Sequence, residues 1–378
     1  MIKSIVRKIV ITIKFFIRSI YSFVSISKSI KISNAKNIPD IGNLLPKNFK
    51  KIQVGIIGTG DISITHINNL KGLSNIFQIN IVCSRTIEKA KMVAKQNKIP
   101  NETDNYMDII RNSEIDAIFI LTRHNSHVEI AMEGIKANKA IFMEKPLAIN
   151  LTELNKLEDA LKIYEKPFMV GFNRRHSPHI QYIKNKIDRR ESPILVNYRQ
   201  NDNNYPIDNW IRGPEGGGVI IGHFCHIIDL FNYLIDKDIC SIIGSKINNK
   251  MKRYIDNDNF GMILTYKDGS IVNIIHTTFG NNKYPKDIFE IFFDDNILEM
   301  NNYEITNHYT ENYVKKGDKN KDKGYLNEVV EFAKMIVQNN NNLEDTKKII
   351  NATKLLFRIQ KEFNKKSDFY IKVESLEK

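Results

Sequence analysis

The chain has 378 residues, of which 42% are hydrophobic and 26% charged, a composition that indicates a globular protein long enough for two domains. Its formal net charge is +13, but residues 1–50 contain ten Lys or Arg and one acid, Asp40, so they alone carry +9. The other 328 residues are nearly balanced, which argues against a nucleic-acid-binding surface on them. The cysteines, Cys83, Cys225 and Cys240, lack the spacing of metal ligands, so we expect a reducing, cytoplasmic compartment and no disulfide framework or structural zinc.

Residues 1–50 predict a basic amphipathic helix followed by a linker. Apolar side chains recur at helical spacing over residues 2–24, while four Lys and Arg side chains gather on another face. The charges interrupt every apolar run, so neither a membrane span nor a secretory signal is predicted. Peripheral contact of residues 1–30 with the inner face of an anionic membrane is the favoured interpretation. The alternatives are a helix that docks on the rest of the chain or on a partner, and an organellar presequence.

Residues 51–171 alternate apolar strands with amphipathic helices, which predicts a Rossmann domain with a parallel sheet and right-handed crossovers. Strands are expected at Ile52–Ile57, Ile79–Cys83, Asp116–Leu121, Ala140–Met143 and Phe168–Gly171. Helices are expected up to about Leu70, over Ile87–Gln96, and near residues 126–137 and 151–163.

A glycine-rich turn joins the first expected strand to the first helix. Gly58 allows a tight turn, and Gly60 lets the backbone approach a pyrophosphate at the helix N-terminus. Ser63 stands where the third glycine of a dinucleotide-binding fingerprint is usual, and its small side chain still permits close packing of helix on strand. The predicted cofactor-binding residues of this turn are Gly58, Gly60, Asp61 and Ile62.

The end of the second strand bears on the choice between NAD and NADP. An acid there would hold the ribose 2′-hydroxyl, but the chain has Ser84 and Arg85, and no acid before Glu88. A hydroxyl and a guanidinium suit a 2′-phosphate, so Ser84 and Arg85 are predicted cofactor residues and NADP is favoured over NAD. The alternative is that Arg85 stacks on the adenine or points into solvent.

Polar residues also follow two later strands. Thr122, Asn125 and His127 lie beyond the strand that ends near Leu121, at the sheet edge where ligands bind in this fold, and are predicted to contact the cofactor. Asn125 and Ser126 could instead cap the next helix.

A lysine follows the next strand, Ala140–Met143, in the sequence Glu144-Lys145-Pro146. A lysine between a carboxylate and a proline at a strand end is suited to holding an amine in a fixed place. Because this strand ends at the same edge of the sheet, Glu144 and Lys145 are predicted to face the cofactor crevice near the nicotinamide.

Residues 172–378 predict an α+β domain for substrate binding and oligomerisation. Its expected strands form an open, mainly antiparallel sheet, whose outer face could pair subunits into a homodimer or homotetramer. These strands are Ile194–Gln200, Gly261–Tyr266, Ser270–Thr277 and Phe289–Phe293.

Between the first two of these strands, three glycines (216–218) lead into an apolar helix with His223, His226 and Asp229. Further ligands for a metal are not found, so no metal site is predicted. Trp210 is interpreted either as a surface for stacking a sugar or as a core residue. Arg174 and Arg175 are interpreted as contacts for an anionic substrate such as a nucleotide sugar, or as solvated side chains.

These motifs together resemble the Gfo/Idh/MocA oxidoreductases, a family that includes glucose–fructose oxidoreductase and inositol 2-dehydrogenase. The resemblance covers residues 51–378 and includes Gly324-Tyr325-Leu326-Asn327-Glu328 at the closing helix. Thr122-Arg123-His124 and Gly171-Phe172-Asn173-Arg174-Arg175 resemble a subgroup often fused behind a zinc-type alcohol dehydrogenase-like domain and encoded with surface-polysaccharide genes. That additional domain is missing from this sequence.

The resemblance implies hydride transfer between a nicotinamide and a sugar or cyclitol hydroxyl or ketone. It implies that Lys145 hydrogen-bonds the reacting oxygen, that His226 takes the hydroxyl proton, and that Glu144 orients Lys145 or the nicotinamide amide. It also implies a cis Lys145–Pro146 bond. Arg174, Trp210, His223 and Asp229 are the candidate substrate residues.

One position departs from the family pattern. An aspartate usually stands four residues before the catalytic histidine, and here that position is Gly222. Either the reaction runs with two groups, or the substrate or His223 completes the site, or dehydrogenase activity has been lost. The favoured hypothesis is an NAD(P)-dependent oxidoreductase that acts on a sugar, cyclitol or nucleotide sugar, and the subgroup resemblance implies a role in surface-polysaccharide synthesis. The alternative is a catalytically impaired, nucleotide-binding scaffold at the membrane surface.

Overall fold

The computed structural model describes residues 45–46, 48–202, 205–248, 255–310, 314–315 and 321–373. The predicted N-terminal helix, with its membrane contact through residues 1–30, lies outside these ranges. Across the described ranges, no helix combines the length and the apolar character that crossing a membrane requires.

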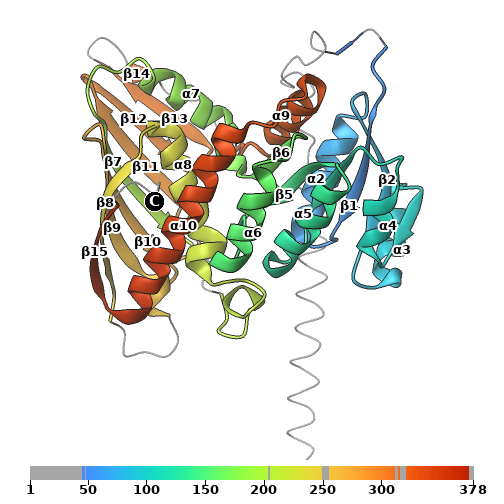
Figure 1. Cartoon of the computed structure of the whole chain (residues 1–378). Coiled ribbons are helices and arrows are strands. Elements are labelled where there is room, and N and C mark those ends of the chain that lie inside the picture. The colour runs from blue at the N-terminus through green and yellow to red at the C-terminus, as the bar shows by residue number, and fades with distance from the viewer. Residues whose placement is uncertain are drawn as a thin grey trace, which may run out of the picture. The chain divides into compact units, whose positions relative to one another are not determined.

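The first sheet is parallel and has the strand order β3-β2-β1-β4-β5-β6 (Figure 1). The order reverses where β1 pairs with both β2 and β4, so the carboxyl ends of β1 and β4 flank a topological switch point. The strands are β1 (Ile52–Ile57), β2 (Phe77–Cys83), β3 (Asn101–Thr103), β4 (Ala117–Ile120), β5 (Ala140–Glu144) and β6 (Phe168–Gly171). The helices between them are α2 (Asp61–Gly72), α3 (Ile87–Asn97), α4 (Tyr106–Arg111), α5 (His127–Lys136) and α6 (Leu151–Leu161). The predicted Rossmann sheet is therefore confirmed.

The second sheet is mixed and mostly antiparallel, as predicted, with the order β14-β13-β12-β11-β7-β10-β9-β8-β15. Only β7 and β10 pair in parallel. The predicted strands are β7 (Leu195–Asn201), β9 (Phe260–Tyr266), β10 (Ile271–Thr277) and β11 (Asp287–Phe293). Those not predicted are β8 (Ile239–Lys246), β12 (Asn296–Asn301), β13 (Ile305–Tyr309), β14 (Val314–Lys315) and β15 (Asp368–Lys372), most of them polar or near an edge of the sheet.

Alternation along these strands gives the second sheet two different faces. Helices α7 (Pro178–Ile187), α8 (Cys225–Ile235) and α10 (Leu343–Lys365) cover one face (Figure 1). The opposite face exposes large apolar side chains, which are Leu195, Ile243, Ile263, Ile271, Ile275, Ile297 and Tyr370. We call this set the outer-face cluster.

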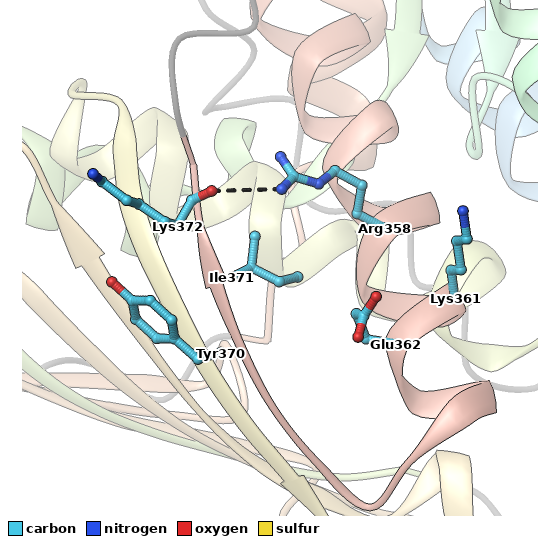
Figure 2. Close-up of a pocket in the computed structure, with 6 residues that line it drawn as sticks. All are labelled: Arg358, Lys361, Glu362, Tyr370, Ile371 and Lys372. Carbon is cyan, nitrogen blue, oxygen red and sulfur yellow. Dashed lines mark hydrogen bonds between the residues drawn. The ribbon is translucent and has the colours of Figure 1, made fainter.

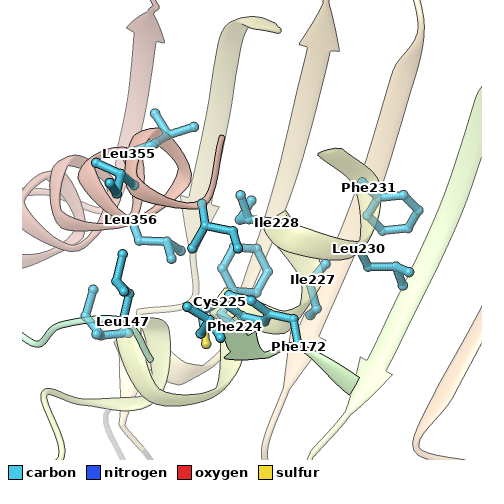
Figure 3. Close-up of a cluster of buried hydrophobic side chains, with 14 of the residues drawn as sticks. Leu147, Phe172, Phe224, Cys225, Ile227, Ile228, Leu230, Phe231, Leu355 and Leu356 are labelled. Atoms are coloured by element: carbon cyan, nitrogen blue, oxygen red, sulfur yellow. The ribbon is translucent and has the colours of Figure 1, made fainter. Parts of the chain in front are cut away.

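Helix α8 is apolar around nearly its whole circumference, which is typical of a helix buried on all sides. It packs against α10 and the covered face of the second sheet, where Phe224, Ile228 and Leu356 belong to one buried cluster (Figure 3). Each such side chain contributes about 1.5–3 kcal/mol by leaving water. This core fixes the position of α8, and with it His226 in the first turn of that helix.

The closing helix α9 (Tyr325–Gln338) packs beside α2 of the first sheet. Gly324 precedes it with a φ of +86°, and a Cβ at that position would lie 2.4 Å from the carbonyl oxygen of Asn173. The motif at residues 324–328 thus places Glu328, a fully buried acid, behind the carboxyl edge of the first sheet.

Candidate active site

The glycine turn has the geometry that a phosphate site needs. Gly58 has a φ of +109°, and a Cβ there would lie 2.5 Å from the Leu121 carbonyl oxygen, so only glycine fits between β1 and β4. A Cβ at Gly60 would meet no described atom within 4 Å. In the described structure no side chain caps α2, so the backbone N–H groups at Asp61 and Ile62 remain available to an anion.

Ser84 lies close to this turn. Its Oγ is 2.7 Å from Oγ1 of Thr59, which links the end of β2 to the glycine turn. Ser84 is buried, whereas Arg85 is exposed beside it. Both residues lie at the sheet edge where the adenosine end of a dinucleotide binds in this fold.

The segment after β4 is arranged differently from the prediction. The Ser126 hydroxyl donates to Thr122 Oγ1 at 2.7 Å and to the Arg123 carbonyl at 2.9 Å, and it does not cap α5. Asn125 is exposed, so the capping alternative is wrong and its side chain stays free to face a ligand. Thr122 is half-buried at the strand end.

His127 does not reach the crevice, which corrects its prediction as a cofactor contact. The ring is fully buried, with Nδ1 3.0 Å from the Pro146 carbonyl oxygen and Nε2 3.2 Å from that of Thr122. Burial, the largest cause, lowers its pKa, while the contacts with the two carbonyl oxygens act in the opposite direction. His127 therefore ties the end of β4 to the Glu144-Lys145-Pro146 segment and positions Lys145 indirectly.

Glu144 is also buried and held by protein partners, and its predicted contact with the cofactor stays a prediction. One carboxylate oxygen lies 2.8 Å from Nε2 of His66, and the other accepts the Lys145 backbone N–H at 3.2 Å. Glu328 lies 4.0 Å from the same His66 nitrogen, and burial next to Glu144 raises its pKa well above the ordinary value. A protonated Glu328 needs no metal ion to balance it, although the three ligand atoms lie within 4.8 Å of one another.

Sequence reasoning missed the buried cluster of His66, Glu144 and Glu328. Glu328 was visible only as part of the motif at residues 324–328, and His66 lies on α2, eight positions after Gly58, without any local signal. The cluster supports the start of the Lys145 segment from behind the sheet.

Lys145 connects the two halves of the site. The Lys145–Pro146 bond is cis, as predicted. The side chain leaves the end of β5, and Nζ donates to the carbonyl oxygen of Gly222 at 2.8 Å. The ammonium group of a lysine has three N–H donors, so two remain available for a ligand after this bond is made.

The segment that Lys145 meets has a backbone that requires glycine, and it contains a widened helical turn. Gly217 and Gly218 have φ values of +75° and +90°, and a Cβ at Gly216 would lie 2.2 Å from Cα of Ile211. A π-helical turn over Ile220–Phe224 then leads into α8. Widened turns of this kind often occur at functional sites, because they re-aim neighbouring side chains.

His226 lies in the first turn of α8. Its ring packs edge-on against Phe172, with 5.8 Å between ring centroids. Burial first, and then the charges of Arg174 and Lys145, lower its pKa well below the ordinary value, so the imidazole is neutral. Nδ1 is buried and has no hydrogen-bond partner among the described residues. The nitrogen without a protein partner is placed to accept a hydrogen bond or a proton from a bound substrate.

His223 faces a second acid, Asp202, which the sequence did not single out. Nδ1 of His223 lies 3.4 Å from the Asp202 carboxylate, which also holds Nζ of Lys286 at 2.5 Å. Burial is the largest cause that lowers the pKa of His223 to about 4, although Asp202 acts in the opposite direction. A charged carboxylate thus reaches the neighbourhood of the π-helical turn through β7.

The two arginines are buried in ion pairs, so the interpretation as solvated side chains is wrong, and their contact with an anionic substrate stays a prediction. Arg174 donates to Tyr198 at 3.1 Å and lies 3.2 Å from Asp287, which is fully buried. Arg175 binds both oxygens of Asp229 and also pairs with Asp345 at 2.6 Å. Asp229 is therefore a structural partner of Arg175, and its prediction as a substrate residue is wrong.

Trp210 is half-buried and contacts the segment after β4. Its ring lies edge-on to His124, at 4.8 Å between centroids, and the Arg123 guanidinium lies 5.3 Å above it. Arg123 in turn pairs with Glu215. Trp210 thus joins the two halves of the site, and it is not a residue of the main core.

A small pocket lies apart from these residues, between α10 and the edge strand β15 (Figure 2). It contains none of the predicted site residues, and Arg358 donates across it to the Lys372 carbonyl oxygen at 3.5 Å. Its lining consists of Arg358, Lys361, Glu362, Tyr370, Ile371 and Lys372.

Comparison with known protein families shows to which family the chain belongs. Residues 52–172 match the family described as "Oxidoreductase family, NAD-binding Rossmann fold", and residues 193–299 match the "GFO/IDH/MocA C-terminal domain". The chain belongs to the Gfo/Idh/MocA family. The first sheet is therefore this family's NAD-binding domain, and the prediction of a nicotinamide-dependent oxidoreductase is confirmed.

Several Gfo/Idh/MocA proteins are similar along much of the chain. "Uncharacterized oxidoreductase YrbE" of Bacillus subtilis (strain 168) is 27% identical over 230 residues, which are 60% of this chain and 67% of that protein. "Inositol 2-dehydrogenase/D-chiro-inositol 3-dehydrogenase" of Lactiplantibacillus plantarum is 25% identical over 256 residues, 66% of this chain and 71% of that protein.

A solved structure titled "Levoglucosan dehydrogenase, complex with NADH and levoglucosan" superposes with a TM-score of 0.74 at 20% identity. It covers 86% of this chain and 100% of its own, and at that identity it shows a shared fold.

Two finer predictions gain no support from these relatives. The matching Rossmann family is described as NAD-binding and the superposed structure holds NADH, so nothing favours NADP over NAD. Neither family match gives evidence for fusion to an alcohol dehydrogenase-like domain.

Proposed function

We propose that this Gfo/Idh/MocA protein interconverts a ring hydroxyl and a ketone of a sugar or cyclitol, with Lys145 and His226 as the catalytic pair. The observation that carries the proposal is the bond from Lys145 Nζ to the Gly222 carbonyl, four residues before His226. It places the amine from the cofactor domain and the imidazole from the second domain at one site. Relatives named as inositol and levoglucosan dehydrogenases support the class of substrate.

Residues of the first sheet fit the cofactor. The open backbone at Gly60 and the uncapped start of α2 would hold the pyrophosphate, and Ser84 and Arg85 would lie near the adenosine ribose. The bound nicotinamide would supply hydride transfer. We propose NAD(H) as the cofactor, because Arg85 is exposed and the family and the NADH-bound relative support NAD.

The chain's own residues supply proton transfer and charge stabilisation. Neutral His226 would take the hydroxyl proton of the substrate during oxidation and return it during reduction. The two free N–H groups of Lys145 would hydrogen-bond the reacting oxygen and stabilise the negative charge that develops there. The Gly222 carbonyl, His127 and the buried Glu144 keep this amine in place.

The test follows the absorbance of the reduced nicotinamide while NAD and a panel of inositols, anhydrosugars, sugars and nucleotide sugars are offered. The subgroup resemblance is the reason for including nucleotide sugars, the expected intermediates of surface-polysaccharide synthesis. Turnover should vanish in Lys145→Ala and persist in Lys162→Ala, a surface lysine paired with Asp159. Turnover that survives Lys145→Ala would remove the proposed role of this lysine.

A second candidate function is a nucleotide-binding scaffold without turnover. The observation that favours it is Gly222, which lacks the acid that usually accompanies this lysine. Tight binding of NADH together with no turnover on the whole panel would support the scaffold over the dehydrogenase.

We further propose that residues 51–171 form the cofactor domain, that residues 172–378 bind substrate, and that the outer-face cluster pairs subunits. Seven large apolar side chains on one face of a sheet are more than isolated exposed residues, and such a face is typical of a protein interface. Ile263→Lys should shift the oligomer toward monomer in light-scattering measurements. Ile163→Lys is a matched control, because that side chain is 85% exposed on another element.

Peripheral membrane contact through residues 1–30 stays a proposal. Anionic liposomes should bind the full chain and not a variant lacking residues 1–40. Equal binding of both would remove the membrane interpretation.

A further inference from the structure

The missing acid has a steric explanation in the structure. A Cβ placed on Gly222 would lie 2.9 Å from Cε1 of His124 and 3.3 Å from its Nδ1. It would also lie 3.0 Å from Cδ1 of Ile211, but that methyl group ends a flexible side chain and can rotate away. The imidazole of His124 therefore occupies the space that a side chain at residue 222 would enter.

His124 is held firmly in this space. It is 5% exposed, its Nδ1 lies 2.8 Å from the Gly216 carbonyl oxygen, and its ring packs edge-on against Trp210. The same backbone that carries the glycine run thus fixes the ring over Gly222. An aspartate at residue 222 and this orientation of His124 exclude each other.

The contact with Gly216 also sets the chemistry of the ring. A carbonyl oxygen only accepts hydrogen bonds, so Nδ1 must carry the proton and Nε2 presents a lone pair. Burial first, and then the charge of Lys145, lower the pKa of His124 to about 2, so the ring is neutral at any physiological pH. A hydrogen-bond acceptor without charge therefore stands near Lys145, where the family pattern has a charged acceptor.

We propose that His124 takes the place of the missing aspartate, and that its Nε2 accepts a hydrogen bond from a substrate hydroxyl beside Lys145. This inference rests on the proposed dehydrogenase function and deepens it. Gly222 is then a requirement of the His124 ring and not a sign of lost activity. Because the acceptor is neutral, no carboxylate at residue 222 offsets the attraction of Lys145 for the oxygen that becomes negative during oxidation.

The proposed steric conflict between His124 and a side chain at residue 222 is tested by measuring thermal stability, which needs no substrate. Ala is ordinarily favoured over Gly within a helical turn. In the presence of His124, however, Gly222→Ala should lower Tm by about 2–6 °C, because the added methyl group overpacks the site. In a His124→Ala background the same change should leave Tm unchanged or raise it. An equal loss of Tm in both backgrounds would show that His124 is not the obstacle and would overturn the inference.

The proposed hydrogen bond from the substrate to His124 is tested by two substitutions that still fill the space of the imidazole ring. His124→Phe removes the lone pair, and we expect kcat/KM for the sugar to fall about 100-fold while KM for NAD changes little. His124→Gln keeps an acceptor and should retain more of the activity than His124→Phe. If His124→Phe is as active as the wild type, the ring is only a filler and the proposal fails.

The exchange of both residues is the strongest test. His124→Gly with Gly222→Asp moves the acceptor to the other chain segment, and kcat/KM should exceed that of either single variant by about tenfold or more. A double variant no better than the product of the single losses would contradict the exchange.

Measurements of sugar binding distinguish a failure of the His124 proposal from a failure of the proposed dehydrogenase function. If the wild type turns over no polyol, the proposed function fails, and calorimetry of sugar binding to NADH-loaded protein still tests His124. Weaker binding in His124→Phe supports the contact, and unchanged binding, or no binding in either protein, removes it.

Discussion

The two sides of the site use their polar residues in different ways. On the side of the first sheet, the turn at Gly58 and Gly60 and the amine of Lys145 face a ligand space and keep free N–H groups. On the side of the second sheet, Arg174, Arg175 and Asp229 form ion pairs with other buried residues of the chain. The difference shows that a charged residue near a site is a good candidate for binding a ligand only when it does not already pair with a buried residue of opposite charge.

The largest effect is expected where an internal pair is broken. Arg175→Met leaves Asp229 buried without its partner, which should cost about 3–5 kcal/mol of unfolding free energy in denaturant titrations. Lys162→Met is the matched control, because that cation is largely exposed and solvent screening leaves its pair with Asp159 little effect on stability. Similar losses in both variants would show that Arg175 behaves as a surface residue.

The next effect concerns activity and not stability. His226→Gln removes the proposed proton acceptor and should lower kcat by about 10² to 10⁴-fold, with little change in Tm. The same substitution at His179, on α7, should leave kcat unchanged, because that ring lies 2.9 Å from the hydroxyl of Thr306 on β13, outside the proposed site. A large loss of Tm in His226→Gln would assign the histidine to the core.

Acid should destabilise the folded chain through its buried histidines. The pKa of His223 is lowered to about 4 and that of His176 to about 3, while unfolded histidines titrate near 6.5. The unfolded chain therefore binds more protons below pH 6.5, so stability present above that pH is lost as the pH falls toward 4. Thermal melts over this range should show the loss, and His176→Gln should make it shallower.

The smallest effect tests the exposed residue at the adenosine end. Arg85→Ala should raise KM for NADP while KM for NAD changes less than about threefold, because an exposed guanidinium interacts weakly with an uncharged ribose. A loss confined to NAD would show instead that Arg85 stacks on the adenine.

Local periodicity was sufficient to predict the first sheet. β1 and β6 have the predicted bounds, and the glycine turn lies where the strand–helix transition placed it. Parallel strands buried on both faces are continuous apolar runs, so their sequences are distinctive. In the second sheet, β8, β12 and β15 were missed because polar residues such as Ser241, Glu299 and Lys372 shorten the apolar pattern that a short window detects.

The sequence by itself determined the fold class and the position of the glycine turn, and it singled out Lys145 and His226 as candidates, because these depend on local spacing and strand order. Only the tertiary structure decided the roles of the other polar residues. It paired Arg175 with Asp229, buried Glu144 against His66, and placed His124 over Gly222. Residues far apart in the chain compete for the same buried space and the same charges, and a linear pattern does not record which of them meet.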